Sequence, residues 1–250
     1  MQRIRPWMCL VALTSAVVPA WAGQAQIAVA ANFAEPIKAI AAVLQKTTGH
    51  TLAVTLGATG KLYAQIHNGA PFDVLLSADT QTSAKLEQEG LAQSGSRFTY
   101  ATGKLVLWSA DNTRVDAKGE ILKNPGLRKV SHANPKIAPY GAAAIQAMDK
   151  LGLGPTLAPK LVQGESIGQA YAFAATGNAD VGFVALSQVL EGGKLKSGSM
   201  WVIPRNLYDP IRQDAVVLQH GLGNDAAQAL VQLLKSPNIK DLIRSYGYEV

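Results

Sequence analysis

Strand-like and helix-like segments alternate along almost the whole chain. Apolar runs such as 26–31, 51–56 and 73–78 are each followed by residues whose apolar positions recur every three or four places. This alternation is typical of α/β proteins, in which helices cover both faces of a sheet. The pattern stops in the polar, basic stretch 111–129 and then starts again. The restart predicts two α/β lobes, although a single domain of this length is also allowed.

The remaining strands are expected in the same pattern, at 97–101, 104–109, 129–134, 160–162, 179–186 and 214–219. Asn32 stands three residues before Glu35, a spacing typical of a helix cap, so we expect Asn32 to begin the first helix. The aromatic tail "SYGYEV" is expected to pack against the core.

The N-terminus has the order of a secretory signal peptide. Arg3 and Arg5 precede an apolar segment, and Ala20-Trp21-Ala22 forms a small-x-small cleavage site. We expect residues 1–22 to be removed and the mature chain to reside in the periplasm. The one cysteine, Cys9, would leave with the signal, so disulfides and thiolate chemistry are excluded from the mature chain.

Charge gives little support to a macromolecular ligand. Without Arg3 and Arg5, 21 basic residues stand against 17 acidic ones, a net charge of +4, and the basic residues are scattered. We therefore expect no nucleic acid partner. The four histidines lie far apart in sequence, so a zinc site is not expected either.

Four loops share one pattern: an apolar strand, then small or hydroxyl residues, then the start of a helix. They are Ala31-Asn32, Ala58-Thr59-Gly60, Pro139-Tyr140-Gly141 and Glu165-Ser166-Ile167-Gly168. In open α/β sheets ligands gather beyond the carboxyl ends of the strands, where all four loops would lie. Helix N-termini carry free N–H groups and positive dipole ends, so four of them around one cleft favour an anion held by neutral donors.

The second loop, "GATGKL" at 57–62, is not a nucleotide loop. A P-loop requires glycine at the position of Thr55 and a hydroxyl residue at the position of Leu62. The alternative without a ligand is that this stretch is an ordinary turn between a strand and a helix.

A rival hypothesis of another class is a secreted serine hydrolase. "GESIG" at 164–168 matches the Gly-x-Ser-x-Gly elbow with Ser166 as nucleophile, and Asp209 or Asp214 and then His220 follow in the matching order. The strand before the elbow is short and polar at its end, and no oxyanion loop precedes it. We therefore expect no enzymatic activity and no catalytic residues.

Six segments together resemble the periplasmic molybdate-binding proteins that serve ABC transporters. They are "VAANFAEPI", "GATGKLYAQIHNGAPFDVLLSAD", "SRFTYATGKLVLWSA", "NPKIAPYGAAA", "ESIGQAYA" and "ADVGFVALSQ". The resemblance implies a two-lobed α/β periplasmic binding protein of type II, with a ligand cleft between the lobes. It divides the chain into lobe I, 23–102 plus 214–250, and lobe II, 103–213.

Carried over by position, the ligand residues of this family fall on Asn32 and Thr59 in the first lobe and on Tyr140 and Ile167 in the second. Molybdenum would be held only as its oxyanion, with no further cofactor. Many family members have serine in place of Asn32 and tyrosine in place of Ala185, while one branch uses asparagine and lacks that tyrosine.

The resemblance also implies the function and the partners. The protein is expected to bind molybdate, and with it tungstate, as a monomer and to deliver it to an ABC permease that a separate ATPase drives. Molybdate carries no proton at neutral pH and needs donors only, and none of the four loops offers an obvious carboxylate to accept a proton from phosphate. A receptor for another tetrahedral oxyanion such as sulfate is the alternative.

Overall fold

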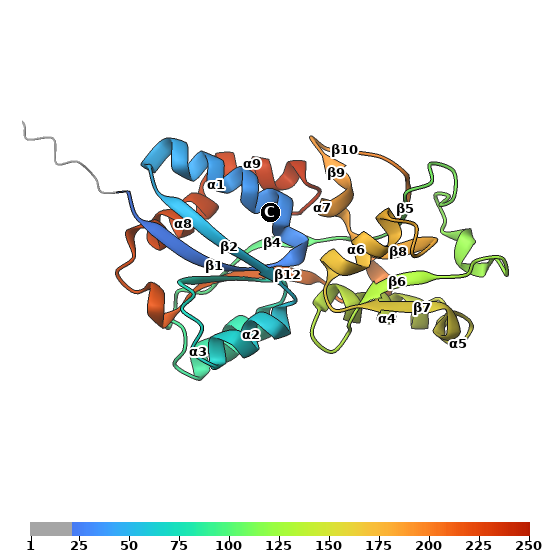
Figure 1. Ribbon diagram of the computed structural model, residues 1–250, viewed down its shortest axis with the longest axis horizontal. Coiled ribbons are helices and arrows are strands. Elements are labelled where there is room, and N and C mark those ends of the chain that lie inside the picture. Colours follow the sequence, from blue (N-terminus) through green and yellow to red (C-terminus); the bar gives the residue numbers. More distant parts are fainter. Residues whose placement is uncertain (1–21) are drawn as a thin grey trace, which may run out of the picture.

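A computed structural model describes residues 22–250 and places them in two α/β lobes (Figure 1). The expected signal peptide lies outside the described residues except for Ala22. Within the described part, no helix is long and apolar enough to cross a membrane.

Lobe I is built on a five-stranded sheet of order β2-β1-β3-β12-β4. β1 runs parallel to β2 and β3, with Ile27 beside Val54 on one side and beside Val74 on the other, whereas β12 is antiparallel to both its neighbours. The strands are β1 (Gln24–Ala30), β2 (Thr51–Gly57), β3 (Val74–Ser77), β4 (Phe98–Gly103) and β12 (Ile211–Val217).

Helices cover both faces of this sheet, as Figure 1 shows. Alternate strand residues face opposite sides: Ile27 and Val29 pack with α1, α8 and α9, while Ala28 packs with α2 and α3. The helices are α1 (Ala34–Thr48), α2 (Thr59–His67), α3 (Thr80–Gln88), α8 (Asp225–Lys235) and α9 (Pro237–Ser245), with a 3-10 turn, η1 (Ala31–Phe33), before α1.

Lobe II repeats this arrangement on a sheet of order β11-β5-β8-β6-β7. Leu105 and Leu107 of β5 pack with α4, whereas Val106 and Trp108 pack with α6 and α7. The strands are β5 (Leu105–Ser109), β6 (Val130–Ala133), β7 (Leu161–Gly164), β8 (Val181–Ala185) and β11 (Ser199–Val202); the helices are α4 (Pro139–Lys150), α5 (Gly154–Leu157), α6 (Ile167–Ala175) and α7 (Leu186–Val189).

Small elements complete the chain: a β9–β10 hairpin (Leu190–Glu191 and Lys194–Leu195) and four further 3-10 turns, η2 (Glu120–Lys123), η3 (Ala158–Lys160), η4 (Arg205–Leu207) and η5 (Gln219–Gly221). The chain passes between the sheets twice, from β4 to β5 and from β11 to β12. The expected boundaries at 102/103 and 213/214 remain a prediction; they fall inside β4 and β12, whose residues pair with each other in the sheet of lobe I.

The expectation that Asn32 caps the first helix is wrong. α1 begins at Ala34 after the 3-10 turn, Phe33 takes the cap position, and no side chain caps the helix. Glu35 instead pairs with Lys38 at 2.9 Å. Asn32 cannot fold back on α1 because its side chain is buried and hydrogen bonded elsewhere.

Candidate ligand site between the lobes

Four loops meet around one small space between the lobes, which we call the inner cavity. It is a narrow space of about 10 Å³, which is room for about one water molecule. Its walls are Ala30, Ala31, Asn32, Gly57, Ala58, Thr59, Ala78, Ala138, Pro139, Tyr140 and Ile167. No Asp, Glu, Lys, Arg or His of the described chain is among them.

The structure brings together all four residues that the sequence singled out. Asn32 and Thr59 come from lobe I, and Tyr140 and Ile167 come from lobe II; each is at most 4% exposed. Their role in holding a ligand remains a prediction, but all four are buried and line one small cavity. Electrostatic interactions gain strength at buried positions because water screens them less.

Three helix starts lie in the cavity wall and carry main-chain N–H groups. Thr59 and Ile167 are the first residues of α2 and α6, and Tyr140 is the second residue of α4. An N–H in the first turn has no acceptor inside its own helix, and the helix dipole places partial positive charge there. The cavity therefore suits a compact anion.

Thr59 adds a hydroxyl donor that is already oriented. Its Oγ1 accepts a hydrogen bond of 3.1 Å from the main-chain N–H of Ala78, at the end of β3. Because that bond uses an oxygen lone pair, the hydroxyl proton stays available for an acceptor in the cavity.

Asn32 is held by a buried network that sequence patterns did not reveal. Its Nδ2 donates to Gln213 Oε1 at 2.7 Å and to Tyr248 Oη at 2.9 Å, and its carbonyl accepts from Ser187 Oγ at 2.7 Å. Both amide protons are thus committed, so the donor that Asn32 keeps for a ligand in this arrangement is its main-chain N–H. Tyr248 was expected to pack, which it does, but its hydroxyl also lies 3.0 Å from Ser187 Oγ.

Tyr140 lines the inner cavity, and its ring packs where the chain crosses from lobe I to lobe II. The buried phenol lies against Gly103, where any Cβ would overlap its hydroxyl, and this hydroxyl has no hydrogen-bond partner in the described chain. Burial, and then the neighbouring phenol of Tyr248, raise the pKa of Tyr140 well above its usual range. Tyr140 therefore stays neutral at physiological pH.

Gly141 explains how Tyr140 is placed. A Cβ at this position would run into the main chain of Ala133 and Asn134, so only glycine lets the first turn of α4 lie on the end of β6.

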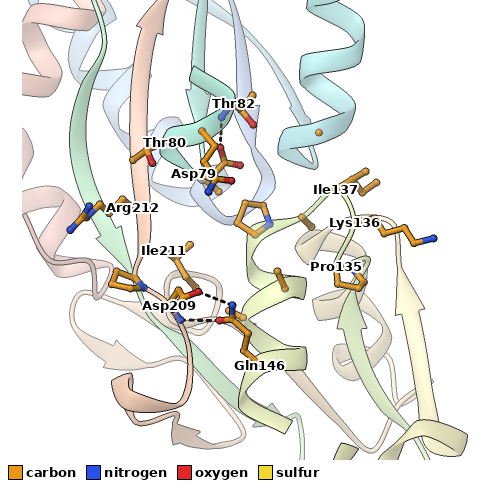
Figure 2. A pocket seen from close by; sticks show the side chains of 18 residues that line it. Asp79, Thr80, Thr82, Pro135, Lys136, Ile137, Gln146, Asp209, Ile211 and Arg212 are labelled. Carbon is orange, nitrogen blue, oxygen red and sulfur yellow. Dashed lines mark hydrogen bonds between the residues drawn. The ribbon is translucent and has the colours of Figure 1, made fainter. Parts of the chain in front are cut away.

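Outside the inner cavity lies a larger outer cleft of about 490 Å³, which shares Ala78, Ala138 and Pro139 with it. Figure 2 shows Asp79 and Thr82 on one side of this cleft and Asp209 with Gln146 on the other. Asp79 caps α3 by accepting from the Thr82 N–H at 2.7 Å. Burial raises the pKa of Asp79 above its usual range, against the lowering effect of the Thr82 hydrogen bonds.

The residues of the hydrolase hypothesis are not assembled. Ser166 Oγ caps α6 by accepting from the Gln169 N–H at 3.3 Å. His220 Nδ1 lies 2.8 Å from Asp73 Oδ1, and Asp214 is paired with Arg97 at 2.9 Å. Asp209 bonds the side chain of Gln146 at 2.8 Å. Each member of the supposed triad thus has a structural partner elsewhere.

Two α/β lobes, two chain crossings and a small anion-favouring cavity between the lobes define the class of two-lobed periplasmic binding proteins. Residues 25–249 match the family described as "Bacterial extracellular solute-binding protein". The chain belongs to that family.

Known proteins resemble it along nearly its full length. It is 56% identical to the molybdate-binding protein ModA of Azotobacter vinelandii, over 92% of this chain and 91% of that protein. It is also 56% identical to ModA of Rhodobacter capsulatus, over 92% and 90%. The solved structure of the Azotobacter vinelandii periplasmic molybdate-binding protein superimposes with a TM-score of 0.87 at 41% identity, covering 90% of this chain and 99% of that one.

Proposed function

We propose that this chain is an extracytoplasmic receptor for molybdate and tungstate, which it hands to an ABC permease driven by a separate ATPase. The observation that carries the proposal is the inner cavity, in which helix starts from both lobes converge with the Thr59 hydroxyl and with no charged side chain. The molybdate-binding relatives at 56% identity support the same ligand class.

The donor set suits a fully deprotonated oxyanion. Molybdate and tungstate offer only acceptors, which match main-chain N–H groups and one hydroxyl. Monoprotonated phosphate would need an acceptor for its proton, and no carboxylate lines the cavity. We therefore expect phosphate to bind far more weakly than molybdate.

Affinity follows from the number of donors. A hydrogen bond to a charged group contributes roughly 1.5–3 kcal/mol. About six such bonds would exceed the roughly 8 kcal/mol of micromolar binding and leave a surplus for closing the lobes.

Sulfate is the alternative ligand, since it is also a tetrahedral dianion at neutral pH. Main-chain donors at helix starts are fixed by the helices that carry them and cannot contract onto a smaller anion. We expect this mismatch in size to select the larger molybdate and tungstate.

Calorimetric titration of residues 23–250 with molybdate, tungstate, sulfate and phosphate tests the proposal. We expect one-to-one binding of the first two at micromolar or lower Kd, and no comparable heat from the others. Tight sulfate binding without molybdate binding would support a sulfate receptor instead. No binding heat from any of the four anions would overturn both proposals. Gel filtration of the same sample tests the expected monomer.

A further inference from the structure

A direct main-chain contact joins the two lobes at the edge of the inner cavity. The N–H of Gly60, the second residue of α2, donates to the carbonyl of Ile137 at 2.9 Å. Gly60 belongs to lobe I, and Ile137 lies in the loop of lobe II between β6 and α4. Their sequence neighbours Thr59 and Ala138 line the inner cavity, so the contact stands next to the ligand space.

This contact leaves too little room for a side chain on Gly60 at ordinary contact distances. A Cβ there would lie 3.0 Å from Ile137 Cβ, 3.1 Å from its Cα and 3.2 Å from its Cγ2. One of those atoms is main chain, and Ile137 stands on the wall of the outer cleft that Figure 2 shows. A methyl group at Gly60 would therefore require Ile137, or the lobe that carries it, to move away by a few tenths of an ångström.

A second contact between the lobes is looser and provides a comparison. Gly168 is the second residue of α6, the same helical position that Gly60 has in α2. A Cβ on Gly168 would lie 3.5 Å from Ala31 Cβ across the cleft and 3.5 Å from Ser166 Oγ, which is ordinary van der Waals contact. The two glycines thus face the opposite lobe from matched helical positions, but only at Gly60 would a Cβ come closer to that lobe than ordinary van der Waals contact.

We propose that Gly60 is a positioning residue for ligand capture: its N–H and the Ile137 carbonyl form a latch that sets how closely the lobes approach over the bound anion. The inference rests on the proposed function, because the latch acts on the anion held in the inner cavity. Neither residue needs to touch the ligand. The bond holds the closed arrangement, and the missing Cβ lets donors of both lobes reach one small anion together.

The test is Gly60→Ala with Gly168→Ala as its matched control, both made in residues 23–250. Both positions are helical with ordinary φ, so alanine favours each helix and should not lower the thermal midpoint of the ligand-free protein. We expect Gly60→Ala to raise the Kd for molybdate roughly tenfold, chiefly through a faster koff measured by stopped-flow fluorescence. Gly168→Ala should stay within about threefold of wild type.

Each other outcome counts against the latch. Unchanged Kd and koff in Gly60→Ala would overturn it, as would an equal loss in Gly168→Ala. A lower thermal midpoint of ligand-free Gly60→Ala would show that Gly60 serves the fold of lobe I and not closure. Wild-type protein that fails to bind molybdate would instead refute the proposed function, so the two failures are told apart by the wild-type titration.

Discussion

Thr59→Val offers the sharpest test of the donor set. The substitution nearly keeps the shape of a side chain that is 1% exposed, and it removes only the hydroxyl. In the structure that hydroxyl accepts from the Ala78 N–H at 3.1 Å and keeps its proton for a ligand in the inner cavity. The substitution therefore changes two interactions that can be measured separately.

Binding should suffer from the loss of the donated proton. A hydrogen bond to a charged group is worth roughly 1.5–3 kcal/mol, and every ~1.4 kcal/mol is a factor of ten, so the Kd for molybdate should rise about 10- to 150-fold. Stability should suffer from the loss of the acceptor. The buried Ala78 N–H would be left unpaired, which costs roughly 1–3 kcal/mol of unfolding free energy.

Calorimetry with molybdate measures the first effect, and urea unfolding of the ligand-free protein measures the second. Thr59→Ser is the matched control, because serine keeps the hydroxyl and both interactions; its Kd should stay within about threefold of wild type. A Kd for Thr59→Val equal to that of Thr59→Ser would refute the assignment of Thr59 as a ligand donor.

Three further predictions concern charge, capping and pH. Thr59→Asp should abolish molybdate binding in calorimetry, because a carboxylate at this buried position would face the anion; measurable affinity would place the ligand elsewhere. Ser166→Ala should leave the Kd nearly unchanged and lower the unfolding free energy by about 1 kcal/mol through the lost α6 cap, whereas a label that reacts with Ser166 in a fluorophosphonate assay would revive the hydrolase hypothesis. Burial raises the pKa of Tyr248 to about 12, whereas a tyrosine in the unfolded chain has a pKa near 10. As the pH rises, Tyr248 therefore loses its proton first in the unfolded chain. Its contribution to the unfolding free energy is complete below about pH 10 and is lost as the pH rises through about 12. Urea unfolding at about pH 9 and about pH 11 should show this fall, and Tyr248→Phe should reduce it.

The sequence was informative where local patterns decide structure. Alternating apolar runs indicated the α/β class, and the strand before Ala31 and the helix at Ile167 lie within a residue or two of their expected positions. Small residues after strands pointed to the four loops around the inner cavity, because strand ends and helix starts lie together in such sheets. Elements of two to four residues, such as β9, β10 and α5, carry too few positions for a period to emerge.

Asn32 shows where local patterns fail. Its spacing from Glu35 matches a helix cap, yet burial beside Gln213 and Tyr248, 181 and 216 residues away in sequence, redirects its side chain. A hydrogen bond between such distant positions depends on how the chain crosses between lobes, and no short window of sequence contains that information.

The sequence by itself determined the α/β class and pointed to four loops at helix starts that would suit an anion, because strand and helix periodicity and helix-start chemistry are local properties. Only the tertiary structure decided that the four loops line one cavity and which hydrogen-bond donors of Asn32 and Thr59 are not used by other protein groups. It also decided that Gly60 is pressed against Ile137 whereas Gly168 faces Ala31 at ordinary contact distance. The physical reason is that the spacing between the two lobes arises from packing across the cleft. Two glycines at the same helical position can therefore have different roles, which depend on the residues of the other lobe that each contacts.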